Sequence, residues 1–385
     1  MIPDATSHTP ASQKAADQDA ADQDAAGQTT YAAAGVDVEA GDRAVELMKS
    51  AVAQTHNAHV VGGFGGFAGL FDVSWLKDFR KPYLATSTDG VGTKVAIAQA
   101  LDIHDTIGYD LVGMVVDDII VCGARPLFMT DYIACGKVVP ERIADIVRGI
   151  AEACASAGVA LVGGETAEHP GLLGVDEYDV AGAATGAVEA DDLLGPERVN
   201  TGDVLIGLPA SGLHSNGYSL VRRIIADAGW ALEREVPEFS RALGEEILTP
   251  TRVYTGDLAA VLDARPGAVH AMSHVTGGGL SANVARVIPP GTLARMHRSS
   301  WEIPPVFTVL GDLGQVPQAD RERTWNLGVG MVLAVDPAAA EAVLAALPGS
   351  WLLGEVTADD GALAADPYYV QGAKGVDGGA AILLD

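Results

Sequence analysis

The motif STDGVGTK, residues 87–94, contains side chains that could bind a metal ion and a phosphate. It follows a short alternating run typical of a strand and precedes an apolar stretch that can be helical, residues 95–101. Gly90 and Gly92 let backbone N–H groups approach an anion, and a helix start favours negative charge. Asp89 would repel a bare phosphate unless a divalent cation, usually Mg²⁺, lay between them. We therefore expect a metal–nucleoside triphosphate site, although an ordinary glycine-rich turn would show the same pattern.

Residues 106–122 are apolar almost all round at helical spacing, which is typical of a buried helix. Asp110 and Asp117 share one edge of this helix, whereas Asp118 falls within its apolar stripe. A carboxylate in that position is costly unless it is paired, hydrogen-bonded or bound to a metal ion. We expect Asp118 to be a metal ligand; the alternative is an acid hydrogen-bonded to neighbouring backbone.

Four other stretches have the composition of binding loops. GGFGGF, residues 62–67, could be a flap over phosphates or a flexible connector, and GGETAEHPG, residues 163–171, is expected to be a glycine turn followed by acids. SGLHSNG, residues 211–217, should begin a helix, with Ser215 or Asn216 as its N-cap. That start is either an anion site with a titratable histidine or a capping cluster with a surface histidine. HVTGGGL forms a further strand–glycine–helix junction.

Hydrophobic periodicity predicts the elements that position these motifs. A helix is expected over residues 37–54, with Val45, Met48 and Val52 on one stripe. Pro140 should open a second helix that Gly158 ends. Strands are expected at residues 83–88, 127–134, 159–162, 178–188, 204–208, 269–274, 326–335, 351–356 and 380–384.

The composition of the chain limits the kinds of molecule that it can bind. The chain has 385 residues, enough for two domains, and a formal net charge of -27 from 51 acidic and 24 basic residues. This charge argues against nucleic acid or an anionic membrane as a partner. The three cysteines have no CxxC spacing, and neither a membrane-spanning apolar run nor a signal peptide is recognisable. We expect a soluble cytoplasmic protein.

The composition also changes along the chain. Residues 1–30 are acidic, of low complexity and nearly free of bulky apolar side chains, so a disordered tail is predicted. A polar, turn-rich stretch separates an N-terminal metal- and nucleotide-binding domain, residues 31–195, from a C-terminal domain, residues 203–385. Residues 359–379 are predicted to be an acidic loop inserted in the second domain.

The motif set resembles one enzyme family. STDGVGTK, VVDDIIVCGARP, GGETAEHPG, SGLHSNGYSLVR and HVTGGG occur in the order seen in phosphoribosylformylglycinamidine cyclo-ligase, also called aminoimidazole ribonucleotide synthetase. The resemblance covers residues 31–356, and the first two motifs recur in sister families such as selenide water dikinase and thiamine-monophosphate kinase. It implies an α/β (α+β) fold of two domains, with mixed sheets covered by helices. It also implies a homodimer paired through the N-terminal domains, with an ATP cleft near the interface.

The resemblance implies a role for each motif residue. Mg²⁺ would be held by Asp89 and Asp118, and the catalytic residues would be His214, as general acid or base, and Lys94, on the triphosphate. ATP and its phosphates would contact Gly62, Gly63, Gly65, Gly66, Thr88, Gly90, Gly92, Thr93 and Lys94. The ribonucleotide would contact Glu165, Thr166, Ser211, Gly212, Ser215, Asn216, His274, Thr276 and Gly277. The chain departs from the family at Ser87, Asp117, Arg125 and His169.

The reaction implied is ATP-dependent closure of an imidazole ring. Formylglycinamidine ribonucleotide would give 5-aminoimidazole ribonucleotide, ADP and phosphate, as in purine biosynthesis. Three alternatives stay open: a kinase like thiamine-monophosphate kinase, a glutamine-dependent synthetase, and a nucleotide-binding protein without catalysis. The presence of the glycine loops, the acids and His214 together favours the cyclo-ligase.

Overall fold

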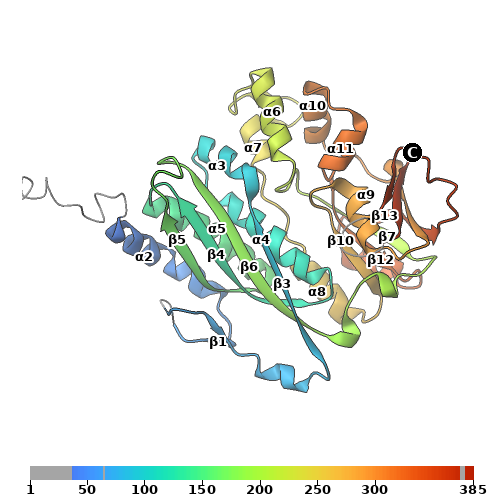
Figure 1. The fold of residues 1–385 in the computed structure, drawn as a ribbon, viewed down its shortest axis with the longest axis horizontal. Coiled ribbons are helices and arrows are strands. Elements are labelled where there is room, and N and C mark those ends of the chain that lie inside the picture. The colour runs from blue at the N-terminus through green and yellow to red at the C-terminus, as the bar shows by residue number, and fades with distance from the viewer. Residues whose placement is uncertain (1–36, 64–65, 373–377) are drawn as a thin grey trace, which may run out of the picture.

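The computed structural model describes residues 37–63, 66–372 and 378–385 and contains two large mixed β-sheets flanked by helices (Figure 1). The predicted disordered tail, residues 1–30, and Gly65 of the glycine loop lie outside the described residues. Among the described residues, no helix has the length and apolar character needed to span a membrane.

The first large sheet has four strands in the order β3-β6-β4-β5. Its strands are β3 (Pro82–Gly90), β4 (Arg125–Cys135), β5 (Ala160–Glu168) and β6 (Tyr178–Glu189). Among neighbouring strands, only β4 and β5 are paired in parallel. Helices α4 (Thr106–Ile120) and α5 (Pro140–Ala157) lie along one face of this sheet, and α2 (Val38–Thr55) packs against α5 (Figure 1). No described helix covers the opposite face.

The second large sheet has seven strands in the order β10-β12-β7-β13-β11-β15-β14. Its strands are β7 (Val204–Pro209), β10 (Val269–His274), β11 (Thr292–His297), β12 (Val329–Val335), β13 (Trp351–Ala358), β14 (Tyr369–Gln371) and β15 (Ala380–Leu384). The helices of this half are α6 (Tyr218–Ala228), α7 (Leu243–Ile247), α8 (Thr255–Ala264), α9 (Gly279–Val284), α10 (Pro305–Leu313), α11 (Gln318–Thr324) and α12 (Ala340–Ala346). The prediction that residues 359–379 form a loop was wrong in part, because β14 lies within this range and pairs with β15.

Local sequence signals explain where several elements begin and end. Helix α5 spans the predicted residues, because Pro140 suits the first turn and Gly158 adopts the left-handed conformation, with φ 71°, that ends it. The side chain of Asp37 caps α2 by accepting the N–H of Ala40. The predicted stripe of α2 was wrong at Val45, which is exposed, whereas Ala44 takes the buried position.

Residues 163–168 form part of strand β5, so the glycine turn predicted for GGETAE was wrong. Gly164 lies opposite Asp131 of β4, and a Cβ added at Gly164 would lie 2.2 Å from Oδ1 of that aspartate. The glycine therefore makes room for a buried carboxylate on the neighbouring strand rather than for a turn.

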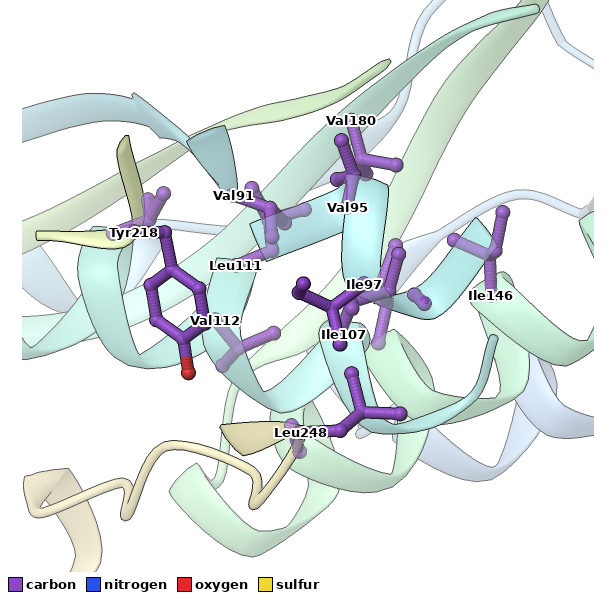
Figure 2. Close-up of a cluster of buried hydrophobic side chains, with 14 of the residues drawn as sticks. Val91, Val95, Ile97, Ile107, Leu111, Val112, Ile146, Val180, Tyr218 and Leu248 are labelled. Carbon is purple, nitrogen blue, oxygen red and sulfur yellow. The ribbon is translucent and has the colours of Figure 1, made fainter. Parts of the chain in front are cut away.

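The largest hydrophobic cluster includes side chains from both halves of the chain. Figure 2 shows Tyr218 and Leu248, from the second half, beside Ile107, Leu111 and Val112 of α4. Leucines and aromatic rings buried in this way each contribute about 1.5–3 kcal/mol. The halves are thus packed as one body, and the loops between them are held by a rigid core.

Close approach of α4 to α5 generates a prediction about stability. A Cβ added at Gly108 would lie 2.1 Å from the backbone nitrogen of Ile150, so Gly108→Ala should lower the free energy of unfolding by about 1–3 kcal/mol or more. Gly41 in α2 has no atom within 4 Å of such a Cβ, so Gly41→Ala should instead raise it by about 0.5–1 kcal/mol. Urea denaturation measures both. Equal effects of the two substitutions would contradict this packing.

Candidate functional site

Asp89, Asp118 and His274 meet where the two halves face each other. Asp89 is near the end of β3, Asp118 lies in α4, and His274 is the last residue of β10. Nδ1 of His274 lies 3.0 Å from Oδ1 of Asp118, whose side chain is 44% exposed although the histidine is buried. The structure therefore brings the two predicted metal ligands and the predicted substrate contact His274 to one partly open place.

The electrostatics of this cluster favour a bound cation. Burial raises the pKa of Asp89, the N–H of Gly90 opposes that rise, and the charge of Asp118 adds to it. Burial alone would lower the pKa of His274, but the hydrogen bond with Asp118 and the charges of Asp117, Asp118 and Asp89 outweigh it and raise the pKa. Several carboxylates thus surround a single imidazole, and a divalent cation would relieve their repulsion.

The donor set fits Mg²⁺ bridged to a nucleotide. Asp89 and Asp118 supply hard carboxylate oxygens, and Mg²⁺ in phosphate sites commonly uses one or two carboxylates plus phosphate oxygens and waters. Within the described part of the chain, no group of three or more His, Cys, Asp or Glu side chains is arranged to hold a metal ion. Two carboxylates would therefore need phosphate oxygens or waters to complete the coordination of a metal ion.

Helix α4 orients its acids differently from the sequence prediction. Asp118 is the exposed residue of a helix that is otherwise almost entirely buried, so its predicted burial in the apolar stripe was wrong. Asp117 is buried and accepts the N–H groups of Tyr254 and Thr255 and the hydroxyl of Thr255. Burial raises the pKa of Asp117 to about 6 despite these hydrogen bonds. Asp117 thus anchors the start of α8.

Lys94 is not directed toward the cleft. Its side chain is completely buried and forms an ion pair with Asp110, at 2.7 Å from Nζ to Oδ1. Nζ also donates to the carbonyl oxygens of His214 and Thr249. An ammonium has three protons, so these acceptors account for all of them. The structure gives Lys94 partners other than the expected triphosphate.

His214 also has a different setting from the one expected. It adopts a left-handed backbone, with φ 60°, which costs a non-glycine residue about 1–2 kcal/mol. Its buried ring accepts the N–H of Ser211 at Nε2, 3.1 Å away. Burial, together with the positive charges of His274, Lys94 and Arg252, holds the pKa of His214 well below its usual value. The ring thus braces its own loop, and the role of His214 as general acid or base stays a prediction.

The rest of the SGLHSNG segment packs against the metal motif. The predicted caps were wrong, because Gly217 occupies the N-cap position of α6 with φ 75° and no side chain caps the helix. The hydroxyl of Ser215 instead donates to the carbonyl of Val91, at 2.6 Å. Thr93 and Ser219 approach within 3.4 Å through their hydroxyls. The segment from the second half thus lies directly on residues 87–94.

Two asparagines join this segment to other loops. Asn326, which the sequence analysis did not single out, donates to the carbonyl of Gly212, at 2.9 Å. A Cβ on Gly277 would lie 3.6 Å from Oδ1 of Asn216, so HVTGGG adjoins SGLHSNG. Asn283 in turn holds the carbonyl of Thr276. The predicted substrate residues Ser211, Gly212, Ser215, Asn216, His274, Thr276 and Gly277 are therefore brought together.

Several other predicted binding residues lie away from the cluster of Asp89, Asp118 and His274. Gly63, Gly66, Glu165 and Thr166 line a cavity of about 310 Å³ between α2 and β5. Gly62, just before this cavity in the chain, has a φ of 91°. Thr88 lies elsewhere, in β3, where its hydroxyl donates to the carbonyl of Gly182 in the neighbouring strand β6. Because two strands separate β5 from β3, Glu165 lies about 14 Å or more from the β3 edge at the usual strand spacing. Within one chain, the structure does not unite Glu165 and Thr166 with the SGLHSNG segment.

Comparison with known proteins first defines a class. The AIR synthase related protein family matches the chain twice, through its N-terminal domain over residues 72–188 and its C-terminal domain over residues 200–365. A solved structure of the hydrogenase maturation protein HypE in complex with ATP has the same fold. It is 19% identical, has a TM-score of 0.56 and covers 89% of this chain and 93% of its own. The predicted α/β fold with mixed sheets is confirmed, and the chain is an AIR synthase related protein.

Curated relatives narrow the class. Phosphoribosylformylglycinamidine cyclo-ligase from Desulfitobacterium hafniense (strain DSM 10664 / DCB-2) is 48% identical over 332 residues, 85% of this chain and 96% of the relative. The Geobacillus kaustophilus protein of the same name is 50% identical over 331 residues, 85% of this chain and 95% of the relative. The chain belongs to the phosphoribosylformylglycinamidine cyclo-ligase family, a family of ligases, as its motifs predicted.

The exposure of Asp118 generates a prediction. Asp118→Asn should leave the melting temperature almost unchanged, because the side chain is partly solvated, yet weaken binding of a Mg²⁺–ATP analogue by about tenfold or more. Calorimetric titration and thermal unfolding measure the two effects. Asp263→Asn, an exposed acid on α8, is the control and should change neither. Wild-type affinity in Asp118→Asn would remove Asp118 from the metal site.

Proposed function

We propose that this protein closes the imidazole ring of 5-aminoimidazole ribonucleotide from formylglycinamidine ribonucleotide, with ATP converted to ADP and phosphate. The observation that supports this most is the junction of the two halves, where the pair Asp89 and Asp118 lies beside the SGLHSNG segment and His274. Such a junction can hold a nucleotide and a second substrate side by side. Relatives that are about half identical in sequence bear the cyclo-ligase name.

The reaction needs activation of a weak electrophile. The formyl oxygen takes the γ-phosphoryl group of ATP, a ring-forming nitrogen attacks the formyl carbon, and the C–O bond breaks as phosphate leaves. Phosphoryl transfer depends on alignment and on neutralising negative charge rather than on covalent help from the protein. Mg²⁺, when held by Asp89 and Asp118, supplies part of that neutralisation. The SGLHSNG and HVTGGG loops keep the ribonucleotide beside the nucleotide.

His274 is the histidine best placed to act on the bound groups. Its Nδ1 is fixed by Asp118, and its buried Nε2 has no hydrogen-bond partner among the described residues. Nε2 is therefore left to form a hydrogen bond with a bound phosphate or substrate group. His214 also has a buried ring nitrogen, Nδ1, without a partner among the described residues, but its Nε2 accepts the N–H of Ser211 in its own loop.

Product analysis tests the reaction. Purified protein with formylglycinamidine ribonucleotide and Mg²⁺–ATP should form aminoimidazole ribonucleotide, ADP and free phosphate in equal amounts, without glutamine or ammonia. A product that keeps the phosphoryl group would indicate a kinase like the one that phosphorylates thiamine monophosphate. ATP binding without turnover would indicate a nucleotide-binding protein. Either outcome would contradict the proposal.

We also propose that the protein is a cytoplasmic homodimer, paired through the uncovered face of the first sheet. Thr88 and Ala183 lie opposite each other on that face, as do Tyr132 and Ala181. Leu84 and Tyr132 are exposed there by 67% and 41%, among small side chains that allow close approach. An apolar sheet face of this kind is costly in water and suits a second copy of the same sheet. The free cysteines Cys122, Cys135 and Cys154 suit a reducing compartment.

Light scattering with size-exclusion chromatography tests the dimer. The wild type should have about twice the mass of the 39.5 kDa chain, and Leu84→Asp/Tyr132→Asp should run as a monomer because charges would be buried in the interface. Leu352→Asp, at an exposed leucine of β13, should stay dimeric. A monomeric wild type, or a dimeric double variant, would refute pairing through this face.

A further inference from the structure

Lys94 is enclosed between the two halves of the chain. Its Nζ lies 2.7 Å from Oδ1 of Asp110, 3.0 Å from the carbonyl oxygen of His214 and 2.7 Å from that of Thr249. Both side chains of the ion pair are 0% exposed. The ring of Tyr218 adds a favourable contact, with its centroid 5.5 Å from Nζ. The positive charge is therefore balanced on several sides without any ligand.

The acceptors of Lys94 come from separate segments. Asp110 belongs to α4, His214 to the SGLHSNG segment, and Thr249 to the turn that follows α7. Oδ1 of Asp110 also accepts the N–H and the hydroxyl of Thr251. If Lys94 turned out toward a triphosphate, a buried carboxylate and two carbonyls would lose a donor, which is strongly unfavourable.

The bond to His214 matters most for the site. His214 has a left-handed backbone, its carbonyl oxygen accepts a hydrogen bond from Lys94, and its ring accepts the N–H of Ser211. Ser215, next in the chain, contacts Val91 of the metal motif. The peptide that Lys94 holds therefore determines where the loop lies on that motif.

We propose that Lys94 is a positioning residue, whose buried ammonium fixes the SGLHSNG loop on the metal motif and does not contact the triphosphate. The expected effects on kcat rest on the proposed function, whereas those on folding and nucleotide binding do not. Lys94 thus joins the two halves of the chain, and other groups neutralise the charge of the phosphates.

Three variants test the proposal. Lys94→Met leaves Asp110 buried without a counter-charge, so its melting temperature should fall by at least about 5 °C. Lys94→Met/Asp110→Asn removes both charges and should recover most of that loss. In this double variant, the affinity for Mg²⁺ with a non-hydrolysable ATP analogue should stay within about threefold of wild type, while kcat falls about tenfold or more because the loop is no longer held. Lys49→Met, at an exposed lysine of α2, is the control and should change none of these quantities.

Two results would overturn the proposal. A folded double variant that binds the nucleotide analogue at least about tenfold more weakly would make Lys94 a triphosphate ligand. A double variant with wild-type affinity and wild-type kcat would make Lys94 a purely structural residue. If the double variant does not fold, Lys94→Met assayed below its melting temperature decides, since a lowered kcat with unchanged analogue affinity supports the proposal, and an unchanged kcat or a weakened affinity refutes it. Analogue binding and unfolding do not require ring closure, so a wild type that makes no product would refute the proposed function alone.

Discussion

Two buried carboxylates on one edge of α4 hold the second half of the chain against the first. Asp110 binds Lys94 and Thr251, and Asp117 binds the backbone at the start of α8. Gly113 lies between them, where a Cβ would come 2.8 Å from the side chain of Thr251. Separating the halves would remove the hydrogen bonds that Thr251, Tyr254 and Thr255 donate to these carboxylates, at about 1.5–3 kcal/mol for each hydrogen bond to a charged group. We call this contact between the halves the seam. Opening it would cost a free energy comparable to a large part of a domain's stability.

This seam determines the geometry of the cleft. Successive residues of a helix point about 100° apart, so the side chain of Asp118 turns into the cleft while that of Asp117 is buried in the seam. His274 then meets Asp118 from the second sheet. One helix thus carries adjacent acids with separate tasks, one that stabilises the assembly and one that is free to bind a cation.

The sequence was informative wherever a local rule decides the structure. The limits of α5 follow from Pro140 and Gly158, and the order of the motifs along the sequence is enough to predict the family. Periodicity failed for Asp118, because it identifies an apolar stripe but not the part of the helix surface that the rest of the chain leaves exposed. Likewise, no local sequence pattern indicates that Lys94 contacts Asp110 and two carbonyl oxygens of the second half. Glu165 was grouped with the SGLHSNG segment by motif alone, and strand order separates them.

A crystal structure of the wild type with Mg²⁺ and a non-hydrolysable ATP analogue tests the central claim most directly. The account predicts carboxylate oxygens of Asp89 and Asp118 at about 2.0–2.1 Å from a metal ion that also binds the phosphates. It also predicts that Nζ of Lys94 keeps its hydrogen bonds with Asp110 and with the carbonyls of His214 and Thr249. A lysine turned onto the triphosphate, or a metal ion held away from Asp89 and Asp118, would contradict it.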